Sequence, residues 1–285
     1  MDKIRDLSKW IENNIKSYIN NSSDNSLGDK FNEKAISGPL IGFSNGNDSY
    51  YKRLKDDIGE FYWTPLEAFK EVYPEAEVTA SELTVICWVM PYAENVKNDH
   101  DKDICYPSER LVMARINGEK VNLGLGKYLK ELLINCGYEA LIPSCSSSWK
   151  VEKSQKYELA ATWSEKHAAF VSGLGTFGLS GALITKAGIA VRLGSIIAKI
   201  PLPVTEREYI RHNEYCLFYS KGVCKKCMER CPSKSISEKG HNKIRCREHI
   251  HKVVANYTKE HYNTSVSPCS LCQTRVPCQS SIPII

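Results

Sequence analysis

Cysteine is concentrated near the C-terminal end of this sequence, and its spacing is the strongest chemical signal in the chain. Eight of the twelve cysteines lie between residues 216 and 278. The segment CKKCMERCP holds three of them, separated by two and then three residues, and a second CxxC pair follows later. The eight are Cys216, Cys224, Cys227, Cys231, Cys246, Cys269, Cys272 and Cys278. Thiolates in such a pattern bind soft metal ions or iron–sulfur clusters, or they pair as disulfides.

The CKKCMERCP segment has the spacing of the last three cysteines of the bacterial ferredoxin cluster run, including the proline after the final one. The first cysteine of that run would fall at Lys221, and Cys216 on a longer loop is its substitute. Two intervening residues let one backbone turn present two sulfurs to one cluster, whereas the Cys-Pro residue points away and binds the other cluster. The spacing therefore predicts two [4Fe–4S] clusters. The first would be held by Cys216, Cys224, Cys227 and Cys278, and the second by Cys231, Cys246, Cys269 and Cys272.

Zinc and disulfides are the alternatives. Two CxxC pairs could build tetrahedral four-thiolate zinc sites, but the interlaced CxxCxxxCP run is unusual for a zinc ribbon. Disulfides are disfavoured because nothing in the sequence looks secreted. The start, MDKIRDLSKWIENN, is too charged for a signal peptide, and apolar runs such as Thr84–Met90 are too short to span a membrane. We therefore expect a soluble, cytoplasmic protein with no membrane partner.

The formal net charge of +5 does not by itself indicate nucleic-acid binding. Basic residues inside the cysteine-rich segment would offset the negative charge of cluster thiolates and line a docking face. These residues are Lys221, Lys225, Lys226, Arg230 and Lys234. No aromatic-plus-basic repeat supports RNA binding.

The residues before the cysteines must supply a fold that positions them. Glu82–Tyr92 is apolar on both faces and predicts a central strand, and Tyr138–Pro143 predicts another. Asn122–Cys136 predicts a helix that ends at Gly137. Apolar residues at helical spacing predict an opening helix, and two polar stretches predict surface loops. The helix residues are Ile4, Leu7, Trp10, Ile11, Ile15 and Ile19, and the loops are Asn21–Gly28 and Gly42–Tyr51.

The second half of this region leads to the cysteines. Lys156–Ser172 predicts a helix because it is rich in alanine and lacks proline and glycine. Ala182–Thr185 and Ile189–Ile200 predict two strands of a hairpin that turns at residues 186–188. Residues 201–203, PLP, predict a boundary between a domain of residues 1–203 and a domain of residues 204–285. Lys243–Tyr262 predicts a helix that carries Cys246.

A glycine loop, Gly173-Leu-Gly175-Thr-Phe-Gly178, matches the dinucleotide-binding pattern GxGxxG. The context argues against NAD, because the loop follows a helix and precedes strand-like sequence. The acidic residue expected about twenty positions later is also missing. Three glycines let the backbone approach a large flat ligand closely. A plain tight turn is the alternative interpretation.

Together these features resemble the epoxyqueuosine reductase and reductive dehalogenase superfamily. The resemblance is carried by HAAFVSGLGTFGLSGALIT, VRLGSIIAKIPLP, the CxxCxxxCP run, a lone helical cysteine and the last CxxC pair, over about residues 80–278. It implies an α+β, nitroreductase-like domain that binds a corrinoid (cobalamin), followed by a ferredoxin-like domain with two [4Fe–4S] clusters. The clusters would pass electrons one at a time to cobalt. The residues expected against the corrinoid are Trp163, Gly173, Gly175, Thr176, Phe177, Gly178 and Ser180.

The sequence departs from that family in three ways. Epoxyqueuosine reductases place an aspartate proton donor in a D-[ST]-x-P segment about fourteen residues before the glycine loop, where this sequence has Glu158 and Leu159. The sequence ends seven residues after Cys278, so we expect no extension that grips tRNA, and tRNA is not an expected partner. No export signal of the respiratory dehalogenase kind is present. Neither named reaction carries over, and the resemblance implies a divergent branch with an unassigned substrate.

A reductive site needs a proton donor near the reduced centre. Glu165 and His167, in the segment TWSEKH before the glycine loop, are the candidate catalytic residues. A structural or exposed role is the alternative for each of them. Tyr92 and Tyr106 are candidate phenol donors, and Cys87, in the apolar strand, is expected to be buried and inert.

The sequence therefore predicts an iron–sulfur oxidoreductase that passes electrons through two clusters to a bound corrinoid. The expected electron donor is a protein such as ferredoxin or flavodoxin. The alternative is a non-catalytic electron carrier or activator that reduces a partner corrinoid protein. A zinc-stabilised binding module is a third interpretation.

Overall fold

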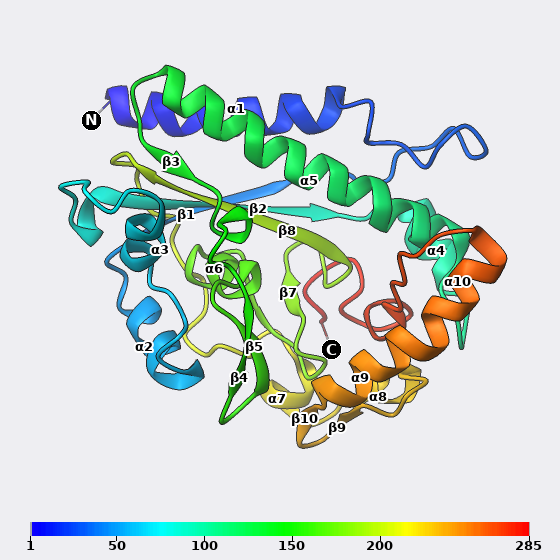
Figure 1. The fold of residues 1–285 in the computed structure, drawn as a ribbon. Coiled ribbons are helices and arrows are strands. Elements are labelled where there is room, and N and C mark those ends of the chain that lie inside the picture. The colour runs from blue at the N-terminus through cyan, green and yellow to red at the C-terminus, as the bar shows by residue number, and fades with distance from the viewer. Residues whose placement is uncertain (1, 285) are drawn as a thin grey trace.

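A four-stranded antiparallel sheet lies at the centre of the molecule (Figure 1). The computed structural model describes residues 2–284, with side chains described from Asp6 onward. The strand order is β1-β2-β8-β3. In the strand register, Ile86 of β2 lies opposite Phe43 of β1 on one side and opposite Ile196 of β8 on the other. The strands are β1 (Leu40–Asn45), β2 (Leu83–Pro91), β8 (Val191–Lys199) and β3 (Ala140–Leu141).

The strand β2 is buried along its whole length, from Leu83 to Pro91. It pairs with a neighbour on both sides, and helices cover both faces of the sheet (Figure 1). A strand without a solvent-facing side needs no alternating polar residues, and LTVICWVMP accordingly has an almost continuous apolar pattern. The predicted central strand is confirmed, and Cys87 within it is fully buried as expected.

Two long helices, α1 (Asp2–Asn21) and α5 (Glu109–Asn135), cover one face of the sheet (Figure 1). The predicted helix over Asn122–Cys136 is the second half of α5, and Gly137 follows with a φ of +86°, the left-handed conformation that ends helices. No helix of residues 2–284 is long and apolar enough to cross a membrane. The α1 residues Ile11, Ile15 and Ile19 are fully buried, whereas the side chain of Ile4 lies outside the described part.

Three shorter helices and two hairpins lie on the other face. A second core joins the helices to β2 and β8, with Tyr51, Phe69 and Phe170 among its buried residues. The first hairpin is β4 with β5, and the second is β6 with β7. These elements are α2 (Ser49–Ile58), α3 (Pro65–Val72), α6 (Glu165–Val171), β4 (Val151–Ser154), β5 (Glu158–Ala161), β6 (Gly175–Phe177) and β7 (Leu183–Thr185).

The cysteine-rich segment forms short elements at the end of the molecule opposite α1 and α5 (Figure 1). The predicted helix over Lys243–Tyr262 is confirmed, although a π-helical stretch, Ile250–Val254, interrupts it. The chain then returns toward the sheet, and Ile189 donates a backbone hydrogen bond to Cys278 at 2.8 Å. The elements are α7 (Leu217–Lys221), α8 (Lys226–Arg230), β9 (Ile236–Ser237), β10 (Gly240–His241), α9 (Lys243–His249) and α10 (Ala255–Tyr262). The helix α4 (Glu94–His100) lies beside α10 (Figure 1).

Two predictions of local structure were wrong. Gly42–Tyr51 is not a surface loop, because residues 42–45 belong to β1 and Tyr51 is a buried residue of α2. Lys156–Ser172 is not one helix, because residues 158–161 form β5 and the helix begins only at Glu165. Glu158 has a φ of +61°, which turns the chain into the β4–β5 hairpin and is incompatible with a helix there.

The predicted hairpin of Ala182–Thr185 with Ile189–Ile200 was also wrong. The tight turn exists, since the amides of Thr185 and Gly188 each donate to the carbonyl of the other residue. However, β7 pairs with β6, whereas β8 pairs with β2 and β3. The long apolar β8 gains more burial between two strands of the central sheet than it would beside a three-residue strand.

Candidate functional site

The eight C-terminal cysteines fall into two groups of four in space. Cys216 precedes α7, Cys224 and Cys227 lie around the start of α8, and Cys278 comes from the returning tail. These four line one cavity, whose other walls include Leu179, Ile184 and Ile189. Burial, and next the negative charges of its three partners, raise the pKa of the Cys278 thiol to about 12. The grouping is the one predicted for the first cluster.

The second group contains Cys231, Cys246, Cys269 and Cys272. Burial raises the pKa of Cys272 well above its ordinary value, and Cys269, Cys231 and Cys246 raise it further through their own negative charge. Cys246 lies in α9, and Cys272 lies in the turn Leu271–Gln273. Cys272 also interacts electrostatically with Cys227, so the two groups are neighbours.

Two serines form hydrogen bonds with the sulfur of Cys231. The amide of Ser235 donates to Sγ at 3.3 Å, and the hydroxyl groups of Ser235 and Ser233 lie 3.2 and 3.4 Å from it. Burial alone would raise the pKa of Cys231, but these hydrogen bonds lower it overall because they stabilise the thiolate. Hydrogen bonds to the ligand sulfurs are one of the features that set the potential of an iron–sulfur cluster.

The donor set of each group fits a four-iron cluster. Each group draws its four thiols from three separate segments, and all of these cysteines are buried or half-buried. Within residues 2–284 no cysteine forms a disulfide, and no three Cys, His, Asp or Glu side chains are close enough to coordinate one ion. The residues that would hold the clusters are therefore the eight that the spacing predicts.

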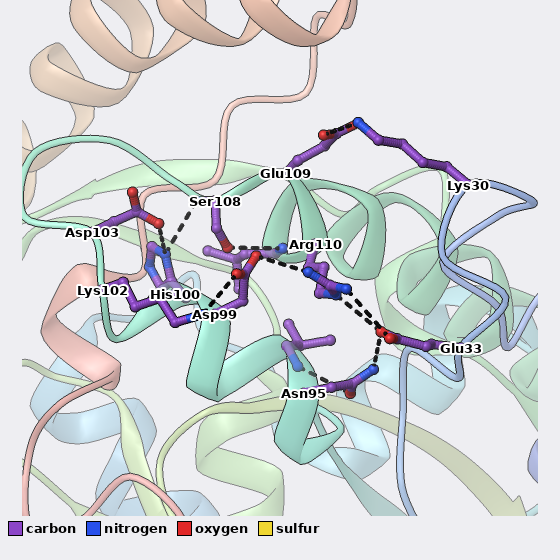
Figure 2. Close-up of polar contacts among 12 residues, drawn as sticks. Lys30, Glu33, Asn95, Asp99, His100, Lys102, Asp103, Ser108, Glu109 and Arg110 are labelled. Carbon is purple, nitrogen blue, oxygen red and sulfur yellow. Dashed lines mark hydrogen bonds and ion pairs between the residues drawn. The ribbon is translucent and has the colours of Figure 1, made fainter.

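His100 anchors the segment that carries Cys269. The amide of Ser108 donates to Nδ1 of His100 at 3.3 Å, so the ring proton lies on Nε2, which donates to the carbonyl of Cys269 at 3.1 Å. Figure 2 shows His100 at the end of α4, between Ser108 and Asp103. Burial, and next the charge of Arg230, lower the pKa of His100 to about 4, so the ring is neutral near pH 7.

Arg230 makes a second link between the same regions. Its Nη1 donates to the carbonyl of Asp103 at 2.6 Å, and its Nε donates to the carbonyl of Thr274 at 3.2 Å. The guanidinium therefore joins the loop after α4 to the loop after Cys272, directly beside Cys231 in the sequence. Two distant parts of the chain thus hold the second group in place.

Lys166, the second residue of α6, lies close enough to the second group to interact with Cys272. Its Nζ donates to the carbonyl of Gly181 at 2.7 Å, and no carboxylate of the described chain pairs with it. Burial, and next the charge of Lys243, lower the pKa of Lys166 to about 8, whereas Cys272 acts in the opposite direction. Lys243 in turn donates to the carbonyl of Leu159 at 2.7 Å.

Glu165 is held by Ser195 of β8. The hydroxyl of Ser195 donates to Oε2 of Glu165, and Nε1 of Trp163 donates to the same hydroxyl at 3.0 Å. The other carboxylate oxygen, Oε1, is buried without a hydrogen-bond partner. Burial outweighs the hydrogen bond from Ser195 and raises the pKa of Glu165 to about 7. A carboxyl with that pKa can store and release a proton near neutral pH.

His167 lies two positions after Glu165 in α6, and its ring is neutral near pH 7. Its Nδ1 is buried without a hydrogen-bond partner, and its ring meets Tyr62 edge-on with centroids 5.8 Å apart. Burial, and next the charge of Lys166, lower the pKa of His167 to about 3. Burial and the charge of Glu165 raise the pKa of Tyr62, so its phenol keeps its proton. Of the three groups at the start of α6, only the Glu165 carboxyl therefore has a pKa that lets it exchange a proton near neutral pH.

The glycines of the loop lie close to other residues of the same protein, which leaves little room for side chains at these positions. A Cβ at Gly175 would lie 2.2 Å from the carbonyl oxygen of Ile184, and one at Gly178 would lie 3.3 Å from the Ile184 side chain. Gly173 has a φ of +78°, and a Cβ there would lie 3.0 Å from the carbonyl oxygen of Glu206. The protein's own packing therefore requires glycine at position 175, a positive φ favours it at position 173, and the contact at Gly178 is tight.

The other residues expected against a corrinoid are also bonded within the chain. The hydroxyl of Thr176 accepts a hydrogen bond from the amide of Tyr215 at 2.9 Å. The amide of Phe177 donates to the backbone carbonyl of His212 at 2.6 Å. Trp163 is buried, as is the hydroxyl of Ser180, which has no hydrogen-bond partner. These residues do not form an open cradle for a flat macrocycle, so corrinoid binding stays a prediction from the resemblance.

Sequence reasoning missed several residues of the site. Ser195 and Tyr62 reach Glu165 and His167 from segments far away in the sequence, and nothing in their local pattern marks them. His100 likewise gave no signal. Lys166 could have been found, because it stands between two predicted catalytic residues and has the opposite charge to cluster thiolates.

The comparisons with known proteins identify a class of fold. No family model matches the sequence, and no curated protein matches it. Solved structures do match, and they are reductases of two kinds, epoxyqueuosine reductases and reductive dehalogenases. The chain therefore shares the fold of these structures.

Three particular structures show how far this similarity extends. A selenomethionine-labelled epoxyqueuosine reductase is 15% identical with a TM-score of 0.54, and the match covers 99% of this chain and 68% of that one. The Bacillus subtilis epoxyqueuosine reductase is also 15% identical, with a TM-score of 0.51, over 99% of this chain and 67% of that one. The catabolic reductive dehalogenase NpRdhA is 12% identical with a TM-score of 0.52, over 86% of this chain but only 30% of that one. Such low identities establish a shared fold of mixed helix and sheet.

Proposed function

We propose that this chain is an iron–sulfur oxidoreductase whose residues 204–285 form a ferredoxin-like domain with two [4Fe–4S] clusters. The observation that carries the proposal is the sorting of eight cysteines into two groups of four. Residues 1–203 would form the nitroreductase-like domain with the reductive site. When bound, the clusters supply single electrons at low potential.

The chain's own residues would direct those electrons and supply protons. Cys227 and Cys272 interact electrostatically, so the two groups are neighbours, and Lys166 of α6 interacts with Cys272 of the second group. Glu165, with its pKa raised to about 7, would release a proton to a substrate held beside it. Ser195 fixes the orientation of that carboxyl through Oε2, and Oε1 is buried without a hydrogen-bond partner. The substrate would be a small molecule that accepts electrons and protons together.

There are two candidates for the electron acceptor. The shared fold and motifs favour a corrinoid bound by residues 1–203 of this chain. The packing of Gly175 against Ile184 favours the second candidate, in which this protein is a carrier that reduces the corrinoid of a partner protein. In both cases we propose a cytoplasmic setting and a ferredoxin or flavodoxin as electron donor.

Metal analysis of oxygen-free protein tests the clusters. We expect about eight irons and eight sulfides per chain, four of each per cluster. Cys246→Ser should lose the second cluster while keeping the electron paramagnetic resonance signal of the first. Cys105→Ser changes an exposed cysteine outside both groups and should leave the iron content unchanged. Zinc in place of iron, or no metal, would contradict the proposal.

A corrinoid titration then separates the two candidates. Cobalamin is added to the reconstituted protein, and binding is followed by the absorption bands of the corrinoid. Saturable binding at one corrinoid per chain would support an enzyme with its own corrinoid. No binding, together with reduction of a separate corrinoid protein, would support the carrier.

A further inference from the structure

The cavity of the first cysteine group contains one polar side chain besides the thiols. Glycine, aliphatic residues and prolines form the rest of its wall, and among the described residues that line it only Ser180 has a hydroxyl. Ser180 belongs to the glycine loop, which comes from the front part of the chain and not from the cysteine-rich segment. The loop therefore contributes a hydrogen-bonding group to a space that is otherwise apolar.

The hydroxyl of Ser180 is buried and has no partner. The residue is 5% exposed, and its Oγ makes no hydrogen bond within the described chain. Native proteins rarely leave a buried hydroxyl in this state, because it loses its bonds to water without replacing them. An ordered water in the cavity would need two to four polar partners, and the wall offers it only this hydroxyl and the thiols. The position of Ser180 therefore points to an acceptor among the sulfur atoms.

The backbone holds Ser180 in place relative to the cysteines. The amide of Gly178 donates to the carbonyl of Ala182 at 2.8 Å and closes the turn that contains Ser180. The amide of Ile189, which follows the same hairpin, donates to the carbonyl of Cys278 at 2.8 Å. Because the turn and the ligand segment are both fixed, the hydroxyl needs only a rotation of its own side chain to meet a sulfur atom.

The second cysteine group already shows this kind of contact. The hydroxyl of Ser235 lies 3.2 Å from Sγ of Cys231, and Ser235 is 3% exposed. Hydrogen bonds to the sulfur atoms of an iron–sulfur cluster are one of the features that set its reduction potential. A buried serine hydroxyl beside each group would therefore influence each cluster separately.

We propose that the hydroxyl of Ser180 donates a hydrogen bond to a sulfur atom of the first cluster and thereby raises the reduction potential of that cluster. The inference rests on the proposed function, since it assumes that the first cluster is bound. When the cluster gains one electron, no covalent bond forms or breaks and the proton stays on Oγ. The hydrogen bond becomes stronger in the reduced state because the sulfur atoms are then more negative. The resemblance predicts a corrinoid beside Ser180, whereas this geometry points to the cluster.

Ser180→Ala tests the proposal, because it removes the hydroxyl and keeps the rest of the side chain. Anaerobic redox titration followed by electron paramagnetic resonance measures both potentials, and Cys246→Ser identifies the two signals. At a fixed potential we expect the ratio of reduced to oxidised first cluster to fall about tenfold, which corresponds to about 59 mV, with the second cluster unchanged. Ser235→Ala should do the reverse. Ser154→Ala removes a buried hydroxyl that donates to the carbonyl of Ile58 at 2.7 Å, outside the cavity, and should change neither potential.

Ser180→Thr shows whether the hydroxyl itself is responsible. Threonine keeps the donor, so the first cluster should have nearly the potential of the wild type. If Ser180→Ala loses the first cluster outright, a threonine variant that keeps the cluster at the wild-type potential supports the hydrogen bond. Loss of the cluster in both variants would mean that the site needs the shape of serine, and the hydrogen bond would be overturned.

The wild type separates failure of this inference from failure of the proposed function. If oxygen-free wild-type protein lacks the signal of the first cluster and holds far fewer than about eight irons per chain, the proposed function fails. If both clusters are present and Ser180→Ala leaves the first potential unchanged, or shifts both potentials equally, the role of Ser180 is overturned while the proposed function stands.

Discussion

At the scale of residues, the most informative group is the carboxyl of Glu165. It is buried beside Ser195 and Trp163, with one oxygen unpartnered. The cost of burying its charge raises its pKa to about 7. The protonated carboxyl is therefore favoured in the folded protein, and this preference makes the stability of the protein depend on pH.

The first prediction concerns Glu165→Gln. In the unfolded chain the pKa of Glu165 is the ordinary one, so the folded protein binds the extra proton between about pH 4.5 and pH 7. The wild type should therefore lose stability relative to Glu165→Gln as pH rises through that range, by up to about 3 kcal/mol. Thermal unfolding of both proteins without oxygen, at pH 5 and pH 8, measures the difference. Parallel pH profiles would show that Glu165 titrates normally.

At the scale of elements, the cysteines depend on contacts with a distant helix. The segment with Cys269 is held by His100 at the end of α4, whose ring is placed by Ser108 at the start of α5. Figure 2 shows that Arg110 of α5 also reaches across to Glu33, with a distance of 3.0 Å from Nε to the carboxylate. The position of a cluster ligand is thus tied to the packing of the helices that cover the sheet.

The second prediction concerns His100→Phe. Phenylalanine has a similar size but leaves the carbonyl of Cys269 and the amide of Ser108 without their partner, at a cost of about 2–5 kcal/mol for the two groups together. The second cluster should therefore be lost at a lower temperature, while the first is affected less. The iron that stays bound after graded heating, together with the resonance signals of the two clusters, measures this. His251→Phe changes an exposed histidine and is the control. Equal loss in both variants would argue against the anchor.

The helices and strands also show how much of the fold could be predicted from the sequence. The strand β2 and the later helices have a continuous or periodic apolar pattern, and these predictions were confirmed. The region before α6 was predicted as a helix because ELAA has helical propensity, but β5 gains its hydrogen bonds from β4, which lies just before it. The turn at Thr185–Gly188 was predicted correctly, yet no local signal tells that β7 and β8 pair with different strands.

In the candidate site, too, residues with a local sequence signal could be predicted, whereas residues brought in by long-range packing could not. The assignment of the eight cysteines to two clusters stays a prediction from spacing rules, and Glu165 and His167 were proposed because they precede the glycine loop. Ser195, Tyr62 and His100 could not be proposed, because each meets its partner only after long-range packing. The glycine loop shows the limit most clearly, since Gly175 is required by the nearby carbonyl of Ile184 and not by any ligand that its motif suggests.

At the scale of the whole molecule, the positions of the two cysteine groups and of Lys166 would give electron transfer a direction. The second cysteine group lies near α6, where Cys272 interacts with Lys166, and Cys272 also interacts with Cys227 of the first group. A cation stabilises a cluster more after it has gained an electron, because the reduced cluster is more negative. Lys166 should therefore raise the reduction potential of the second cluster relative to the first, which favours movement of electrons inward.

The third prediction is that Lys166→Gln lowers the potential of the second cluster and leaves that of the first nearly unchanged. Loss of one partly buried charge should cost on the order of 1 kcal/mol, and a tenfold change in the equilibrium corresponds to about 59 mV for one electron. Anaerobic redox titration followed by electron paramagnetic resonance measures both potentials, and Cys246→Ser identifies which signal belongs to which cluster. Lys186→Gln removes an exposed lysine paired with Glu208 and is the matched control. Lys166→Arg keeps the charge and should keep the potential. If glutamine and arginine at position 166 shifted the second potential equally, shape and not charge would be the cause, and the inward gradient would have no support from this lysine.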